Sequence, residues 1–328
     1  MLKLTSSMQK SRTLLVICTL LLLAGCSDSS PANNSNVDNS NLSGKAVEQS
    51  LSEIDMKAKV NPKESTVELP GDRFSRLTDS EEGRIGDAFV VARAVCARSI
   101  GIDYPVPRLG IADAREYAMF SELGPWTEEM ANRFAYTRPG TIADQVYNGY
   151  IPMPSGFSKK TDPFDKLSLE TLNTVTTKCD NSKDAKPFNQ QELYKLRSPA
   201  AQELDFDAIL KKLANNSNYK KALEDLKQCY QEVGIRLEEK KDGKNTYTEI
   251  VGVDYRKINE KQITLALKDV QCKTKVDFVN RVAQEAAKLQ APIIKKNIKE
   301  FTAWRAKVDE NIKKAEEYIA AHQDVVLK

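Results

Sequence analysis

Cysteine is the residue type with the clearest chemistry in this chain. Six are present, and four of them, Cys96, Cys179, Cys229 and Cys272, lie beyond the first 60 residues. None of these four has the Cys-x2-Cys spacing of a zinc site, so we expect disulfides and no metal. Four cysteines allow three connectivities, of which we predict Cys96–Cys179 and Cys229–Cys272.

Histidine is almost absent, which limits the catalytic chemistry. His322 is the only one, so a Ser-His-Asp triad, a Cys-His pair and a two-His zinc site all lack residues. Neighbouring glutamates such as Glu81-Glu82 and Glu128-Glu129 point apart on a helix and are typical of caps and surface charge. We therefore expect no catalysis and no cofactor. A carboxylate-dependent hydrolase is the alternative, because two acidic side chains at the right separation suffice.

The first 26 residues have the pattern of an export signal. Lys3, Lys10 and Arg12 precede an apolar run over 14–23, and small residues follow. That run is shorter than the roughly 20 residues of a membrane span. Leu23-Ala24-Gly25-Cys26 resembles the lipobox of bacterial lipoproteins. The resemblance implies cleavage before Cys26 and acylation of Cys26. The alternative is an ordinary cleaved signal with an incidental cysteine.

A lipidated Cys26 would fix the location of the protein. We expect an acyl (palmitate) anchor to hold it on the extracytoplasmic face of the cell membrane, with a cell-wall or envelope-protein partner. Export also favours the predicted disulfides. The formal charge of +3 in 328 residues argues against nucleic acid as a partner and against a dedicated patch for anionic lipids.

The chain divides by composition into four parts. We predict a signal peptide over 1–25, a disordered Ser/Asn-rich tether over 26–60, an aromatic- and proline-rich helical subdomain over 61–200, and a second helical subdomain over 201–328. The tether has too few apolar residues to offset the entropy of ordering it.

The expected fold is mainly α, an irregular helical domain with a small β-hairpin around Asp242-Gly243 and two disulfides. Periodicity and capping residues predict helices over 79–99, 113–122, 127–135, 168–178, 189–196, 205–214, 218–233 and 258–269. An apolar stripe predicts a long amphipathic helix over 274–321, kinked at Pro292. The stripe has no clean heptad, so we expect it to pack within the chain, with a coiled-coil dimer as the alternative.

The segment from Tyr104 to Phe157 combines aromatic, proline and arginine residues. Aromatic faces and arginine forks often bind sugars, peptides and carboxylates. The candidate contact residues are Tyr104, Arg108, Trp126, Tyr136, Arg138 and Tyr150. The alternative is that the aromatic side chains hold an irregular segment in the core.

Two cysteines share a local pattern. Cys96-x4-Gly101-Ile102 is echoed by Cys229-x4-Gly234-Ile235, and in each the glycine suits a left-handed helix cap. One explanation of this echo is chance combined with the preference for glycine at helix caps. The other is that the chain contains two related helical units, each bridged from its helix end to a later element.

The longer motifs resemble an uncharacterised family of actinobacterial cell-surface lipoproteins. The likeness covers about 67–320 and rests on the Cys96–Pro107 segment, on Ala266–Lys273, which is similar to Ala-x-x-Asp-Val-x-Cys-Lys, and on Asn297 with Phe301. Ala97 and Tyr230 replace the methionine that follows cysteine in that family. The resemblance implies a location and an architecture but no reaction. We therefore expect a binding or scaffolding lipoprotein, with a solute receptor of an importer as a further alternative.

Overall fold

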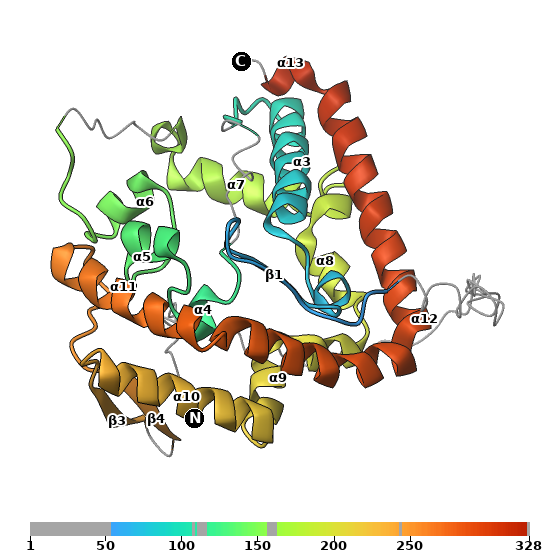
Figure 1. Ribbon diagram of the computed structural model, residues 1–328. Coiled ribbons are helices and arrows are strands. Elements are labelled where there is room, and N and C mark those ends of the chain that lie inside the picture. The colour runs from blue at the N-terminus through green and yellow to red at the C-terminus, as the bar shows by residue number, and fades with distance from the viewer. Residues whose placement is uncertain (1–53, 107–108, 110–116, 156–162, 243–244, 327–328) are drawn as a thin grey trace, which may run out of the picture.

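The computed structural model describes residues 54–106, 109, 117–155, 163–242 and 245–326. Its architecture is mainly helical, with two small antiparallel hairpins, as the sequence predicts. One helix organises the arrangement. α12 (Phe278–Ala321) runs across the lower half of the molecule in Figure 1, turns a corner, and continues upward beside α3 (Asp79–Ser99). Its first arm contacts α9 (Phe206–Leu213), α10 (Ser217–Glu232) and α11 (Glu260–Lys275).

The corner of α12 does not lie where the sequence predicts it. The helix passes through Pro292 and breaks at Asn297, whose backbone leaves the helical region (φ −115°, ψ 15°). The Asn297 side chain donates from Nδ2 to the Ile293 carbonyl at 2.9 Å. It therefore supplies a partner to a carbonyl next to the break, where backbone bonding is interrupted.

Two apolar stripes explain why the long helix bends. The first arm packs into a large core cluster through Val282, Ala283 and Ala286, whereas the second arm packs on α3 through Trp304 and Val308. At the corner itself, Ile294, Ile298 and Phe301 form a corner cluster with Phe74, Ala201 and Leu204. The stripe is therefore buried within the chain, as expected of a helix that packs on its own core.

Order begins earlier than the predicted tether boundary at residue 60. β1 (Lys59–Asn61) pairs with β2 (Thr66–Glu68), and Ala58 is buried. Ile54 and Met56 pack against the corner cluster. The prediction was wrong for 54–60, because these scattered apolar residues gain a partner only when the distant corner of α12 is folded. Residues 26–53 lie outside the described part.

The predicted helix over 79–99 is confirmed, with the same bounds, as α3. Thr78 accepts from the Glu81 backbone, and the Glu81 carboxylate accepts from the Thr78 backbone, which is a capping box. α2 (Asp72–Ser75) precedes α3. On its buried face α3 contacts α7 (Leu169–Cys179), α8 (Gln190–Lys195) and the 3-10 helix η2 (Lys186–Phe188).

The irregular middle of the chain contains short helices. These are α4 (Phe120–Leu123), α5 (Glu128–Phe134), α6 (Ile142–Tyr147) and the 3-10 helix η1 (Pro163–Lys166). Of the predicted helix over 113–122, residues 113–116 lie outside the described part. The prediction was wrong for 117–119, because Met119 takes a left-handed φ of 58° and the helix begins only at Phe120. α6 was not predicted, although Thr141 and Asp144 form a capping box that signals it.

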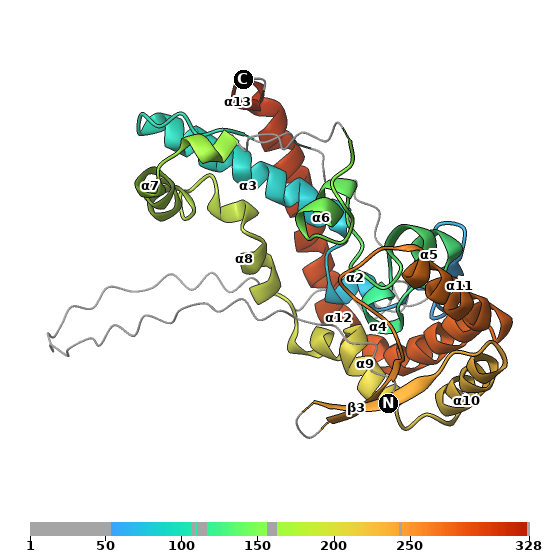
Figure 2. The same cartoon turned by 90° about the vertical axis from the view of Figure 1, so that its left-hand side faces the viewer.

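The second half follows the sequence prediction more closely. The 3-10 helix η3 (Pro199–Leu204) leads into α9 and α10, and the predicted hairpin is present as β3 (Leu237–Asp242) and β4 (Asn245–Ile250). α11 is longer than predicted and ends at Lys275, and α13 (Gln323–Val326) closes the chain against α3. Figure 2 shows α10 and α11 at the end of the molecule opposite α13.

Both predicted disulfides are present. Cys96–Cys179 joins α3 to α7, and Cys229–Cys272 joins α10 to α11. The glycines of the echoed pattern, Gly101 and Gly234, both adopt left-handed φ, +81° and +74°. Each cysteine therefore lies in the last turns of a helix that ends in the same way and is bridged to a later helix. Within the described chain, no helix combines the length and apolar character needed to cross a bilayer.

Candidate functional site

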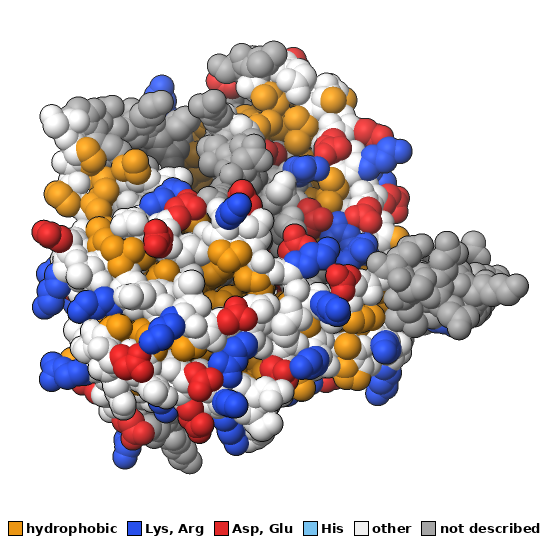
Figure 3. All heavy atoms as spheres, in the orientation of Figure 1, with side chains coloured by type: hydrophobic (Ala, Val, Ile, Leu, Met, Phe, Trp, Pro, Cys, Tyr) orange, Lys and Arg blue, Asp and Glu red, His pale blue; other side chains and the backbone are white. Residues whose placement is uncertain are grey.

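A cleft of about 940 Å³ is the candidate functional site. Four stretches line it: 67–79 before and into α3, 117–122 around α4, 138–144 before α6, and 205–207 at the start of α9. Its charged lining residues are Asp72, Asp79, Glu122, Asp144, Asp205, Asp207, Arg76, Arg133 and Arg138. A smaller hollow of about 690 Å³ shares Val67, Leu69 and Asp72 with it. Acidic and basic side chains are intermingled over the face seen in Figure 3.

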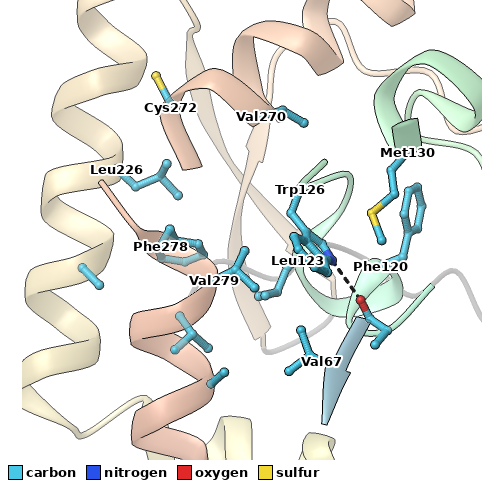
Figure 4. Close-up of a cluster of buried hydrophobic side chains, with 14 of the residues drawn as sticks. Val67, Phe120, Leu123, Trp126, Met130, Leu226, Val270, Cys272, Phe278 and Val279 are labelled. Carbon is cyan, nitrogen blue, oxygen red and sulfur yellow. Dashed lines mark hydrogen bonds between the residues drawn. The ribbon is translucent and has the colours of Figure 1, made fainter. Parts of the chain in front are cut away.

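The wall formed by 117–122 is held in place by buried hydrogen bonds. Trp126 Nε1 donates to the Ala118 carbonyl at 2.9 Å, while its ring lies among Leu123, Val279 and their neighbours in the large core cluster (Figure 4). Within this wall Met119 takes a left-handed φ of 58°, an uncommon conformation for a residue other than glycine. Surrounding packing must hold such a backbone in place.

A buried side chain joins two of the cleft walls to α12. Gln290 accepts from the Gly71 backbone at 2.9 Å and donates to the Leu204 carbonyl at 2.7 Å. Gly71 precedes α2, and Leu204 precedes the acidic pair Asp205 and Asp207. Gln290 therefore connects two sides of the cleft to the first arm of α12.

The acidic side chains of the cleft interact with one another. Burial raises the pKa of Glu122 above its usual 4.5, and the charge of Asp207 raises it further, while Arg76 opposes the shift. Burial likewise raises the pKa of Asp205, which Arg197 opposes and Asp207 reinforces. The cleft therefore holds carboxyl groups whose ionised forms are destabilised, a property that catalytic and binding sites share.

At the rim of the cleft, the guanidinium of Arg133 contacts a carboxylate and two aromatic side chains. Arg133 Nη1 donates to Glu129 Oε1 at 2.9 Å and to the Tyr117 hydroxyl at 2.5 Å. Its guanidinium also lies over the Phe134 ring, 5.0 Å from the centroid. These contacts fix the orientation of Arg133 beside the opening.

A second polar centre is wholly enclosed. Asp269 and Lys273, on successive turns of α11, pair at 2.9 Å with side-chain exposures of 0% and 1%. Lys273 also donates to the carbonyls of Leu123 (2.5 Å) and Pro125 (2.8 Å). Asp269 accepts from the Tyr230 hydroxyl at 2.6 Å. All three donors of Lys273 are therefore used. Through the carbonyls of Leu123 and Pro125, the pair holds the segment that follows the 117–122 wall of the cleft.

Burial dominates the titration of this pair. It raises the pKa of Asp269 and lowers that of Lys273, and the charge of each partner opposes the shift of the other. The same environment raises the pKa of Tyr230 and Tyr136 well above 10. Asp269, Cys272 and Lys273 are the defining residues of the motif quoted above, so in this chain that motif combines a disulfide with a buried ion pair.

The six predicted contact residues do not form one surface. Trp126 and Tyr136 are each 4% exposed in the large core cluster, so for these two the core alternative is correct. The Tyr136 hydroxyl lies 3.4 Å from Asp269 of α11, and Trp126 packs beside Leu123 (Figure 4), contacts that sequence spacing could not reveal. Tyr104 is half-buried, packs on Phe164 and accepts from Arg93.

The other three predicted contact residues lie apart. Tyr150 is half-buried, and its carbonyl accepts from the Ile258 backbone. Arg108 lies outside the described residues, as does the predicted lipidation site Cys26. Of the five that the structure describes, Arg138 alone lines the cleft, where its side chain is exposed.

Sequence reasoning missed the acidic residues of the cleft. Asp205 stands at the N-cap position of α9, which the sequence explains as a helix cap. Its side chain makes no capping bond and instead meets Arg197 at 3.4 Å. The Asp-x-Asp pair at 205 and 207 was the available signal, but it carries no information about Glu122, which comes from a distant segment.

Comparisons with known proteins give no relative. No family model matches the chain, and no curated protein or solved structure is significantly similar to it. Over the residues described by the structure, no group of three or more histidine, cysteine, aspartate or glutamate residues is arranged to hold a metal ion.

Proposed function

We propose that this protein is a lipid-anchored binding protein of the cell envelope, without catalytic activity, and that the cleft around Arg138 and Glu122 is its contact site. The carrying observation is the cleft itself. Its walls come from four separate segments and are held by buried bonds from Trp126 and Gln290. Preorganised walls reduce the entropy lost when a ligand binds.

The chemistry of the lining favours a ligand with charges of both signs. Carboxylates cluster near Asp205 and Asp207, whereas Arg138 is exposed at another wall. A peptide of the cell wall carries free amines and carboxylates and matches both. Apolar lining residues such as Met119 and Phe206 would contact its aliphatic parts.

Cosedimentation with purified insoluble peptidoglycan tests the binding proposal. We expect the protein to sediment with it, and Arg138→Ala to weaken this severalfold without changing the melting temperature. Lys178→Ala, an exposed change on α7 away from the cleft, is the matched control. Equal sedimentation of the Arg138 variant and the wild type, or none by the wild type, would contradict the proposal.

The anchor has its own test. Radiolabelled palmitate should enter the wild-type protein, and Cys26→Ala should abolish its entry. Uptake that survives this substitution, or no uptake by either protein, would exclude the anchor at Cys26. Binding to peptidoglycan can be scored independently of this result.

A carboxylate-dependent cell-wall hydrolase is the second candidate. One observation favours it: Glu122 combines a raised pKa with a place in the cleft close to the charge of Asp207. Acid-assisted glycoside cleavage uses two carboxyl groups, one of which has a raised pKa and acts as the general acid. Release of soluble sugar from peptidoglycan, lost in Glu122→Gln, would support the hydrolase, whereas no release would favour binding alone.

A further inference from the structure

The corner of α12 concentrates positive charge. From Ala286 to Glu300 the chain has four lysines and one acid, a net of +3 within fifteen residues. The whole chain has the same net charge over 328 residues. Although the chain as a whole is nearly neutral, the stretch that contains the corner of α12 is therefore strongly basic.

Three of these lysines are available to a partner. Lys295, Lys296 and Lys299 are all exposed, and among the residues that the structure describes none of the three forms an ion pair. The fourth, Lys288, pairs with Glu285 at 2.6 Å, yet its side chain stays 67% exposed. The single acid, Glu300, accepts from the Ser198 hydroxyl. Three of the four lysines therefore have no ion-pair partner among the described residues.

The same corner is where the chain enters the fold. Ile54 and Met56, among the first residues described, pack against the corner cluster that contains Ile294 and Ile298 (Figure 1). Twenty-seven residues lie between Cys26 and Ile54. Even at full extension a chain of that length spans at most about 100 Å, so a lipid on Cys26 would keep this corner tethered near the bilayer.

We propose that the α12 corner, made of Lys295, Lys296 and Lys299, is the face with which this protein contacts the anionic headgroups of the membrane. The proposal rests on the lipid anchor proposed above and adds an orientation to it. The lysines supply the complementary charge, and each basic residue near an anionic surface strengthens its attraction about five-fold. The anchor supplies the high local concentration that such weak contacts need.

Amine labelling of the lipidated protein tests this orientation. The protein is reconstituted into vesicles of phosphatidylcholine, with or without phosphatidylglycerol, and lightly acetylated, and each lysine is quantified by peptide mass spectrometry. We expect phosphatidylglycerol to slow acetylation of the three corner lysines about five-fold, and high salt to reverse this. The exposed lysines Lys178, Lys183 and Lys186, at α7 and η2, serve as internal controls and should react equally in both vesicles.

A matched pair of triple variants distinguishes binding through the three corner lysines from a general attraction of the protein's positive charge to the anionic membrane. In Lys295→Gln/Lys296→Gln/Lys299→Gln, acetylation of Lys288 should no longer depend on phosphatidylglycerol. In Lys178→Gln/Lys183→Gln/Lys186→Gln the dependence should persist. Equal labelling of the corner lysines in both vesicles, or equal protection of the α7 lysines, would overturn the proposal. Palmitate uptake is measured on the same variants, so a missing anchor is distinguished from an inactive patch.

Discussion

Lys273 is the residue whose environment differs most from what its type suggests. A lysine is rarely buried, yet this one is enclosed and shares its three donors among Asp269, Leu123 and Pro125. Such a pair stabilises little compared with apolar packing, but removing one partner leaves an uncompensated buried charge. Its role is therefore to position the 120–126 segment against α11.

Replacing Lys273 should be severely destabilising. We expect Lys273→Met to lower the free energy of unfolding by about 3–5 kcal/mol, measured by urea denaturation. Lys314→Met is the matched control, because Lys314 pairs with Glu310 at the same helical spacing but in solvent. That control should leave stability almost unchanged. Similar losses in the two variants would contradict the positioning role.

Glu122 predicts a pH dependence of stability. Its pKa is higher in the folded protein than the usual 4.5, so between the two values the folded state binds more protons and stability falls as pH rises. Glu122→Gln removes this cost. The variant should be more stable than the wild type at neutral pH, and the difference should shrink as pH falls toward 4.5 and vanish below it.

Urea denaturation across a pH series measures this effect. Glu128→Gln, on the exposed face of α5, is the control and should show no gain at neutral pH. A loss of stability in Glu122→Gln at neutral pH would mean that the ionised carboxylate makes a stabilising contact.

At the scale of elements, two helices are each joined by a disulfide near their C-terminal ends to a later helix. α3 and α10 each end in a left-handed glycine, and each is bridged near that end to a later helix. The sequence predicted both bridges. It also predicted every described helix longer than seven residues, and most of their ends to within about two residues; the end of α11 is the main exception. It succeeded because caps and helical periodicity are local signals.

Removing either disulfide should cost several kcal/mol of stability, with the longer loop costing slightly more. Cys96–Cys179 spans 83 residues and Cys229–Cys272 spans 43. The chain-entropy model gives roughly 4.5 and 4 kcal/mol for such loops. We expect paired Cys→Ala variants to lose stability of this order in denaturant titrations under identical conditions. A paired variant as stable as the wild type would show that its bridge contributes nothing to folding.

At the scale of the whole molecule, Gln290 connects the corner of α12 to both sides of the cleft. A Cβ on Gly71 would lie only 2.8–3.0 Å from the Gln290 amide atoms. Because that amide is buried and makes two backbone hydrogen bonds, it has little room to move. The segment before α2 can therefore approach α12 only with a glycine here.

Two glycine substitutions should give opposite results. We expect Gly71→Ala to cost about 1–3 kcal/mol through overpacking, whereas Gly86→Ala, inside α3 with its nearest neighbour at 3.7 Å, should gain about 0.5–1 kcal/mol. Thermal and urea unfolding measure both. In a Gln290→Ala background the cost of Gly71→Ala should disappear, and a cost that persists would locate the strain elsewhere.

The sequence by itself determined the helical class, the capped helices, the hairpin and the pairing of four cysteines, because each depends on residues close in the chain or on few combinations. Only the tertiary structure decided that Trp126 and Tyr136 are core residues, that α12 turns at Asn297, and that Glu122 and Asp205 line the same cleft. These features depend on which distant surfaces meet. An irregular segment has no periodicity that shows which side is buried, and a long helix bends where its two arms pack into two separate clusters.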